Sequence, residues 1–103
     1  MRIVNEPAIA RFIRKHGDSR SWLESWLIVA RNASWQSIQD VNCTYAGADG
    51  GVRVASGAKV TVFDVCGNRY RLIADVVYPI HTITVLEIMT HSEYSKNRWK
   101  RRY

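Results

Sequence analysis

The apolar residues of this 103-residue chain change their spacing near its middle, and that change determines the class of fold. In the first half they recur every three or four positions, which is the repeat of a helix with one buried face. In the second half they come in short runs of Val, Ile, Thr and aromatic residues separated by turn signals, as in strands. Helices followed by an antiparallel sheet predict an α+β domain.

Two helices and a short third one are expected in the first half of the chain. The first covers residues 6–16, with Asn5 as its N-cap and Gly17 as its stop signal. The second covers residues 19–31 and repeats the same apolar spacing. The segment 37–40 has the spacing of a capping box and predicts the start of a third helix.

Four strands are expected around these helices. Residues 1–4 predict a short edge strand, and residues 59–65, 69–78 and 82–89 predict an antiparallel meander. The segment 46–51, rich in glycine, is expected to be a loop. The chain is long enough for one domain, so residues 1–103 are expected to form a single unit that ends in a basic tail.

A two-residue turn at Gly67–Asn68 sets the register of the first hairpin. It places Asp64 opposite Arg71 in the neighbouring strand. Because side chains alternate along a strand, Asp64, Arg69 and Arg71 are expected on one face of the sheet. The other face is expected to carry apolar core residues, namely Phe63, Tyr70 and Leu72.

Positive charge is concentrated at the C-terminal end. The chain has a net charge of +6, and its last eight residues, 96–103, include five Lys or Arg residues and no acid. Such a tail can bind phosphates, and its Trp99 and Tyr103 could stack on bases. The other interpretation is a solvated terminus that aids solubility. Since this end of the chain lacks apolar periodicity, deletion of Lys100 to Tyr103 is expected to weaken RNA or ribosome association and to leave the fold intact.

Several classes of site lack support in the sequence. No apolar stretch is long enough to cross a membrane, and no secretion signal begins the chain, so a cytoplasmic protein is expected. The glycine motifs of nucleotide-binding loops are missing. The histidines are too scattered for a metal site, and Cys43 and Cys66 lie outside any nucleophile motif and are expected to be reduced. We therefore predict no metal and no cofactor.

The segment from Thr90 to Glu93 follows the last expected strand and has the spacing of a capping box. With Thr90 as N-cap, the side chains of His91, Tyr94 and Arg98 share one face of a terminal helix. A histidine, a phenol and nearby arginines fit phosphodiester cleavage by a ribose 2′-hydroxyl, which needs a base, an acid and cations for the phosphorane. The same pattern also fits an ordinary capped helix with a packed Tyr94 and an exposed His91.

Two motifs in this order resemble the HigB toxins, which belong to the RelE-like group of toxin–antitoxin systems. The first is Gly67-Asn68-Arg69-Tyr70-Arg71-Leu72-Ile73, and the second is Thr90-His91-Ser92-Glu93-Tyr94. The resemblance implies a RelE-like fold, a small antiparallel sheet with two or three N-terminal helices packed on it and a short C-terminal helix. It also implies an mRNA interferase, an endoribonuclease that is often ribosome-associated and cuts by 2′-hydroxyl attack without a metal.

The resemblance also implies partners and roles for particular residues. The partners would be a HigA-type helix-turn-helix antitoxin, mRNA and the ribosome, with no membrane involved. The catalytic residues would be Arg71, His91 and Tyr94. The resemblance and the basic tail together predict RNA-binding roles for Lys59, Asn68, Arg69, Lys96 and Arg98.

Two positions depart from the family pattern. The family usually has asparagine at the position of Asp64, which faces Arg71 here, and often has an acid where Ser95 stands. A structural cross-strand ion pair is therefore an alternative role for Arg71. The alternative functions are a catalytically inactive RelE-fold protein that binds antitoxin or RNA, and a generic basic RNA-binding domain.

Overall fold

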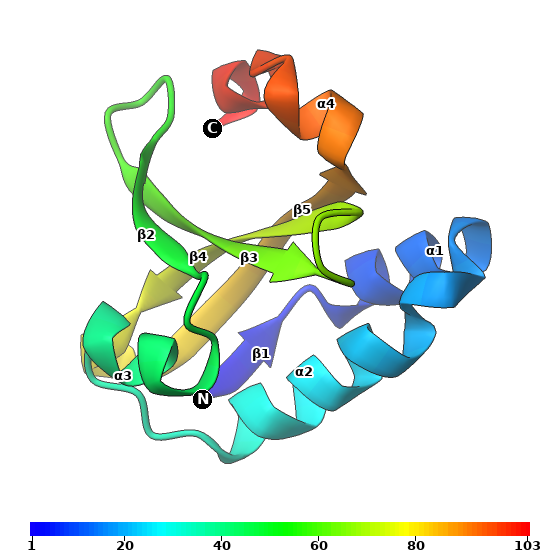
Figure 1. The fold of residues 1–103 in the computed structure, drawn as a ribbon. Helices are drawn as coiled ribbons and strands as arrows, with labels where there is room; N and C mark the ends of the chain where they lie inside the picture. The colour runs from blue at the N-terminus through cyan, green and yellow to red at the C-terminus, as the bar shows by residue number, and fades with distance from the viewer.

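One five-stranded sheet forms the centre of the molecule, in the strand order β1-β5-β4-β3-β2 (Figure 1). The computed structural model describes residues 1–103. The strands are β1 (Arg2–Val4), β2 (Asp49–Arg53), β3 (Lys59–Val65), β4 (Tyr70–Val77) and β5 (Thr82–Thr90). The α-helices are α1 (Glu6–Lys15), α2 (Arg20–Asn32), α3 (Ile38–Thr44) and α4 (His91–Ser95), and the 3-10 helices are η1 (Gly17–Ser19), η2 (Tyr78–Ile80) and η3 (Arg98–Arg102). Neighbouring strands are antiparallel except β1 and β5, which confirms the predicted α+β fold.

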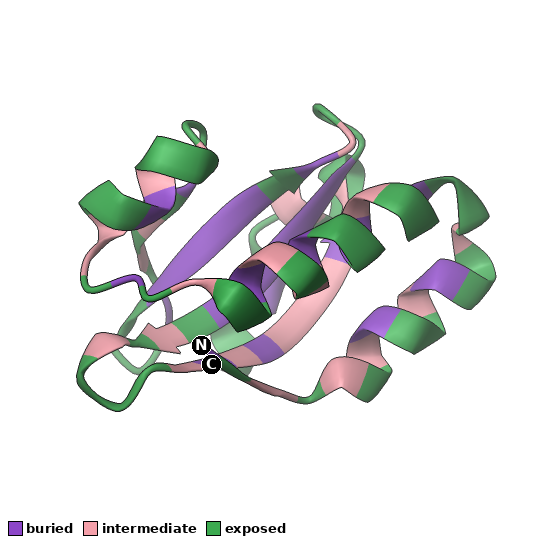
Figure 2. Ribbon diagram, turned by 90° about the horizontal axis from the view of Figure 1, so that it is seen from below, coloured by how far each residue is buried: buried purple, intermediate pink, exposed green.

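Three helices, α1 to α3, cover one face of the sheet, which we call the helix face. A cluster of sixteen buried residues lies between them. Leu23 and Trp26 of α2 and Leu72 of β4 are fully buried in it. Figure 2 shows the buried residues on the sheet and on the inner sides of α1 and α2, with exposed residues on their outer sides. The apolar spacing that predicted two amphipathic helices therefore marks the sides that pack on the sheet.

The opposite face of the sheet, which we call the open face, has a smaller apolar cluster of six buried residues. Val62 of β3, Ile73 of β4 and Met89 of β5 belong to it. No long helix covers these residues. The C-terminal segment covers them. Its Trp99, in η3, packs in this cluster and is 1% exposed. The open face therefore depends on residues that follow the last strand.

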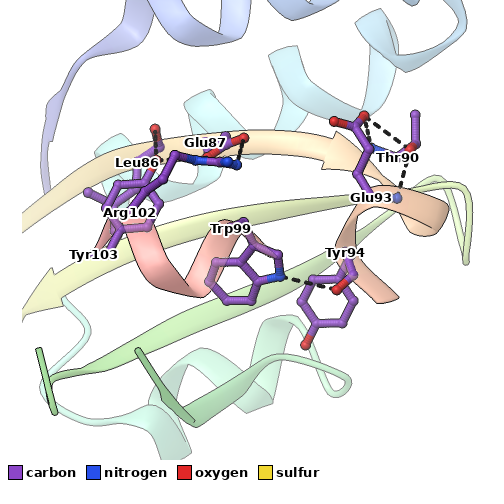
Figure 3. Close-up of polar contacts among 8 residues, drawn as sticks. All are labelled: Leu86, Glu87, Thr90, Glu93, Tyr94, Trp99, Arg102 and Tyr103. Atoms are coloured by element: carbon purple, nitrogen blue, oxygen red, sulfur yellow. Dashed lines mark hydrogen bonds and ion pairs between the residues drawn. The ribbon is translucent and has the colours of Figure 1, made fainter. Parts of the chain in front are cut away.

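The C-terminal segment is folded onto the sheet, so the expectation of a solvated terminus is wrong. The indole N–H of Trp99 donates to the Tyr94 carbonyl at 3.1 Å. The Tyr103 hydroxyl donates to the Leu86 carbonyl at 3.2 Å, and Arg102 pairs with Glu87 at 2.6 Å (Figure 3). Since Trp99 is buried here, it cannot stack on bases in this conformation. Deletion of Lys100 to Tyr103 would keep Trp99 and remove the contacts of Arg102 and Tyr103, so survival of the fold after that deletion stays a prediction.

A bulge in β5 reverses the alternation of its side chains. Ile73 pairs with Glu87, but the next residue, Ala74, pairs with Val85, which leaves Leu86 as the extra residue. Val85 therefore points into the helix-face cluster, whereas Met89, four residues later, lies in the open-face cluster. A strand without the bulge would place both on the same face.

The predicted hairpin register is confirmed, because Asp64 pairs with Arg71 across β3 and β4. The predicted loop at 46–51 is partly wrong, because Asp49–Arg53 forms edge strand β2. Its glycines have little strand preference, but pairing with β3 overrides that preference. Gly50 also lies so close to Ile38 of α3 that a Cβ atom there would be 2.9 Å from the Ile38 side chain.

Two predicted helix caps differ from the structure, although the helices themselves are present. Asn5 adopts a left-handed conformation with φ of 69°, and its side chain donates to the Val85 carbonyl at 2.8 Å instead of capping α1. Ser37 makes no side-chain cap at α3. The carboxylate of Asp40 instead accepts a hydrogen bond from the Gln36 amide at 2.9 Å, outside the helix.

Candidate active site

The guanidinium of Arg71 lies on the open face, near the hairpin turn, and is held by one ion pair and two hydrogen bonds. Its Nε lies 3.1 Å from Asp64 Oδ1. Its two terminal nitrogens donate to the Asn68 side-chain oxygen at 3.1 Å and to the Tyr70 carbonyl at 3.0 Å. The two terminal nitrogens carry four N–H groups, so one N–H group on each of them remains unbonded.

Burial differs sharply between the two partners of this ion pair. The Arg71 side chain is 10% exposed, whereas the Asp64 side chain is 45% exposed. The cross-strand pair that the sequence offered as an alternative role for Arg71 is therefore present. This ion pair is compatible with a catalytic role of Arg71, because a guanidinium can hold a carboxylate and present its remaining N–H groups to a phosphate.

Tyr94 of α4 lies directly beside Arg71. The Arg71 guanidinium carbon is 5.5 Å from the centroid of the Tyr94 ring, a cation–π distance. On its other side the Tyr94 ring stacks on Trp99, with centroids 5.5 Å apart and planes inclined by 20° (Figure 3). Burial raises the pKa of the Tyr94 phenol, and the negative charge of Asp49 raises it further. The phenol is therefore protonated at neutral pH and can donate a proton or a hydrogen bond.

The first turn of α4 is fixed by the predicted capping box, which is confirmed. The Thr90 side chain accepts from the Glu93 amide at 3.2 Å, and the Glu93 carboxylate accepts from the Thr90 amide at 3.3 Å (Figure 3). His91 is the first residue of the helix, and its amide donates to the Arg69 carbonyl at 3.0 Å. This bond ties α4 to the hairpin turn. The His91 side chain is exposed to solvent.

Arg98 does not share a helix face with His91 and Tyr94, so that prediction is wrong. Helix α4 ends at Ser95, and Asn97 adopts a left-handed conformation with φ of 60°. The chain therefore changes direction before η3 begins. Arg98 and Lys96 are both exposed, and they line a pocket together with Met89, Trp99 and Arg102.

Arg69 does not lie on the same face as Asp64 and Arg71, which also contradicts the prediction. Its side chain pairs with Asp18 of η1 at 2.9 Å, on the side of the helices. The physical reason is the turn, in which Cys66 and Gly67 both have positive φ, so that regular alternation stops at Tyr70. The predicted RNA-binding residue is therefore in an ion pair away from the open face.

Of the remaining predicted RNA-binding residues, the structure brings one to Arg71. Asn68 contacts its guanidinium, as described above. Lys59 is exposed at the other end of β3. Five residues separate it from Asp64, a span of about 17 Å along a strand, and an odd separation places the two on opposite faces. The structure does not bring Lys59 to this site.

Comparison with known protein families places most of the chain in one of them. Residues 19–97 match the model of the HigB toxin family, described as the RelE-like toxic component of a toxin–antitoxin system. This chain belongs to the HigB toxin family. A search of curated proteins finds no match. As a HigB toxin, the chain is the toxin of a toxin–antitoxin pair, and proteins of this kind are generally ribonucleases.

The HigB match includes the residues that surround Arg71 and Tyr94 but ends at Asn97. Trp99, which supports the Tyr94 ring, lies beyond it, as do Arg102 and Tyr103. Two searches of the structure of this HigB toxin find nothing. No helix has the length and apolar character needed to cross a membrane. No three His, Cys, Asp or Glu side chains are grouped as metal ligands.

Sequence reasoning missed three residues that shape the site. The sequence places Trp99 in a tail that is solvated or stacks on RNA, although tryptophan side chains are highly buried on average and Trp99 is buried here. Asp49 was placed in a loop, but its charge acts on Tyr94. Asp18 holds both the Tyr70 hydroxyl at 2.7 Å and Arg69, and so anchors the turn next to Arg71. No local pattern marks the last two residues.

Proposed function

We propose that this HigB toxin is an mRNA endoribonuclease that cleaves by attack of the RNA's own 2′-hydroxyl. The observation that carries the proposal is the placement of Tyr94 against Arg71, 5.5 Å from its guanidinium, with His91 exposed one turn away. Both family-like motifs thus contribute to one end of the open face. The HigB membership of the chain supports the same function.

The reaction needs one proton removed and one delivered. The ribose 2′-oxygen attacks the adjacent phosphorus and loses its proton, while the bond from phosphorus to the 5′-oxygen breaks and that oxygen gains a proton. We assign the first transfer to the imidazole of His91, because histidine is the side chain that most often acts as a general base. Tyr94 suits the second transfer, because its raised pKa keeps the phenol protonated.

Arg71 supplies positive charge where the phosphorane gains negative charge. Its two unbonded N–H groups can donate to phosphate oxygens, and its low exposure strengthens the electrostatic effect. The pair with Asp64 reduces the net charge at the site. An inactive HigB-fold protein that only binds antitoxin or RNA is the second candidate function, and the Asp64–Arg71 pair is the observation that favours it.

The partners and location that we propose follow from the same family. A HigA-type helix-turn-helix antitoxin would neutralise the toxin, and mRNA on the ribosome would be the substrate, in the cytoplasm. The proposed reaction uses no metal and no cofactor, since the side chains of His91, Tyr94 and Arg71 supply a base, an acid and a cation, in that order.

Growth and RNA cleavage test the proposal together. Expression of the chain without an antitoxin should arrest bacterial growth, and both His91→Ala and Tyr94→Phe should restore it. Ser92→Ala, an exposed neighbour on α4, is the matched control and should stay toxic. Mapped 5′ ends of mRNA should appear only with the toxic variants.

A chemical readout identifies the nucleophile. An RNA with a single 2′-deoxy nucleotide at the mapped position should resist cleavage there, and cleavage of the unmodified RNA should persist in excess EDTA. Equal toxicity of the wild-type and His91→Ala proteins, at equal soluble levels, would remove His91 from the catalytic groups. A folded wild-type protein that never cuts RNA, with or without ribosomes, would favour the inactive binder.

A further inference from the structure

Two hollows lie along the outer edge of β5. The first, about 470 Å³, lies between α1 and the segment Leu86–Ile88 of β5. Leu86 packs with the open-face cluster and Ile88 with the helix-face cluster, so the hollow opens on the edge of the strand. This edge is uncovered there because β1 pairs with β5 only at residues 82–84.

The second hollow, about 270 Å³, lies between α4, η3 and the end of β5. Met89 and Trp99 form its apolar floor, and Lys96, Arg98 and Arg102 line it. Trp99 is the same ring that stacks on Tyr94. The second hollow is therefore separated from the candidate active site by a single layer of aromatic side chains.

The two hollows are neighbours. Glu87 lines the first and Arg102 lines the second, and these residues are bonded to each other at 3.0 and 2.6 Å (Figure 3). The hollows thus form a continuous band along β5. We call this band the edge track, defined by its five outward cations, Arg11, Arg14, Lys15, Lys96 and Arg98.

The cations of the edge track have no partners within the protein. None of the five makes an ion pair or a side-chain hydrogen bond, whereas Arg31, Arg69 and Arg71 each pair with a carboxylate. The two acids of the track are already engaged, Glu87 by Arg102 and Tyr103 and Glu93 by the capping box. The band therefore has an excess of unneutralised positive charge, which attracts a polyanion.

We propose that the edge track binds the phosphate backbone of single-stranded RNA, as a second RNA contact distinct from the active site. The hollows favour a single strand over a duplex, because half-buried Phe12 and Ile88 in the first offer apolar contact to unstacked bases. The proposal concerns binding alone and holds whether or not the chain cleaves RNA. The strand can be the substrate mRNA or an unpaired part of ribosomal RNA.

Fluorescence anisotropy with an uncleavable probe tests the proposal. The probe is a labelled single-stranded RNA with 2′-O-methyl groups throughout, and the binding constant is measured over a range of salt concentrations. Two double variants address the two hollows, Arg11→Gln with Arg14→Gln and Lys96→Gln with Arg98→Gln. The control double variant, Arg2→Gln with Arg20→Gln, removes the same charge from exposed positions outside the track.

Each track variant should weaken binding roughly tenfold near physiological salt and lower the log–log salt slope by about 1.4, since each single-strand phosphate contact contributes about 0.7. The control should change the affinity less than twofold. An equal loss in the control would overturn the proposal in favour of net charge alone. Equal binding of a duplex RNA would overturn the single-strand assignment.

Two further measurements separate the sources of the strand and the classes of partner. Sedimentation of the same variants with ribosomes shows whether ribosomal RNA uses the track in addition to free strands. If the track variants bind RNA normally but lose the co-expressed antitoxin, the track is a protein-docking surface and the proposal is wrong. Because cleavage is not measured, a toxin that proves inactive leaves these results unaffected.

Discussion

The two faces of the sheet are built in different ways. The helix face has sixteen buried residues under three helices, whereas the open face has six under a short, strongly basic segment. The first arrangement is a core of ordinary depth, formed by local apolar repeats. The second depends on one aromatic residue, Trp99, which follows the last strand and a left-handed Asn97. Stability and the candidate site are therefore concentrated on opposite faces.

This difference between the helix face and the open face explains why solvent reaches the candidate site. Asp64 and His91 are exposed to solvent, because no long helix covers them, while the guanidinium of Arg71 is largely buried. A deep core on the helix face holds β4 and β5 in place, so the open face can have polar and strained features without loss of the fold. The bulge at Leu86 and the positive φ values at Cys66 and Gly67 are such features.

The largest expected effects compare one tryptophan from each face. Trp26→Ala should lower the free energy of unfolding by about 3–5 kcal/mol, because it opens a cavity in a closed core. Trp99→Ala should cost about 2–3 kcal/mol, because the surface segment above it can close partly onto Met89. Urea denaturation measures both losses of unfolding free energy, provided that both variants show the same dependence of that free energy on urea concentration.

The comparison of Trp26 with Trp99 also predicts which variant keeps its fold but loses RNA cleavage. Trp99→Ala should remain folded and lose cleavage, because the Tyr94 ring loses its stacking partner. Arg101→Ala, an exposed neighbour in η3, is the control and should change stability by less than about 0.5 kcal/mol. A Trp99→Ala variant less stable than Trp26→Ala would contradict the division between the two faces.

The parts of this structure that the sequence predicts are the parts that local sequence patterns determine. The helices α1 and α2, the hairpin register and the capping box at Thr90 depend on residues within a few positions of each other, and all are present. Arg69 was misplaced because its partner Asp18 is 51 residues away. Strand β2 was missed because pairing with β3, not its own glycines, makes it a strand.

The same reason limits prediction of the candidate site. The motifs locate Arg71, His91 and Tyr94 at one end of the sheet, but they do not show that Asn68 and Asp64 hold the guanidinium or that Trp99 supports the phenol. These contacts form across the sheet or after a change of chain direction. Apolar periodicity reports on contacts within one element, so it predicts neither kind of contact. The basic tail is therefore interpreted from its composition and not from its packing.

A smaller effect is expected from the ion pair on the open face. Asp64→Ala should lower the free energy of unfolding by about 1–3 kcal/mol, because the largely buried guanidinium of Arg71 loses its carboxylate partner. Asp64→Asn should cost less than about 1 kcal/mol, because the amide oxygen can still accept. Thermal melts and single-turnover cleavage are measured side by side.

The cleavage rates then separate a structural role of Arg71 from a catalytic one. If Arg71 binds the scissile phosphate, Asp64→Asn should hold or raise the rate and Arg71→Ala should lower it about 10²-fold or more, the scale of one lost transition-state donor. If the pair is only structural, Asp64→Asn leaves the rate unchanged. A folded Arg71→Ala variant with undiminished cleavage would remove Arg71 from the site.

The smallest expected effect concerns Asp18, the acid that joins the helix side to the hairpin turn. A hydrogen bond from the Tyr70 hydroxyl, followed by the bond and charge of Arg69, holds the pKa of Asp18 below its ordinary value. The unfolded chain therefore takes up this proton at a higher pH than the folded chain. The Asp18 carboxylate then stabilises the fold above its unfolded pKa, and this contribution is lost as the pH falls through the folded pKa.

Thermal melts across the acidic range test this contribution. Asp18→Asn should melt below the wild type at neutral pH, and the difference should shrink as the pH falls below about 4, the ordinary pKa of aspartate. Arg69→Gln, which keeps the Tyr70 bond, should show a weaker form of the same trend. A difference between Asp18→Asn and wild type that stays constant with pH would mean that the carboxylate has the same pKa in both states. The turn beside Arg71 would then be held by Tyr70 packing rather than by the charge of Asp18.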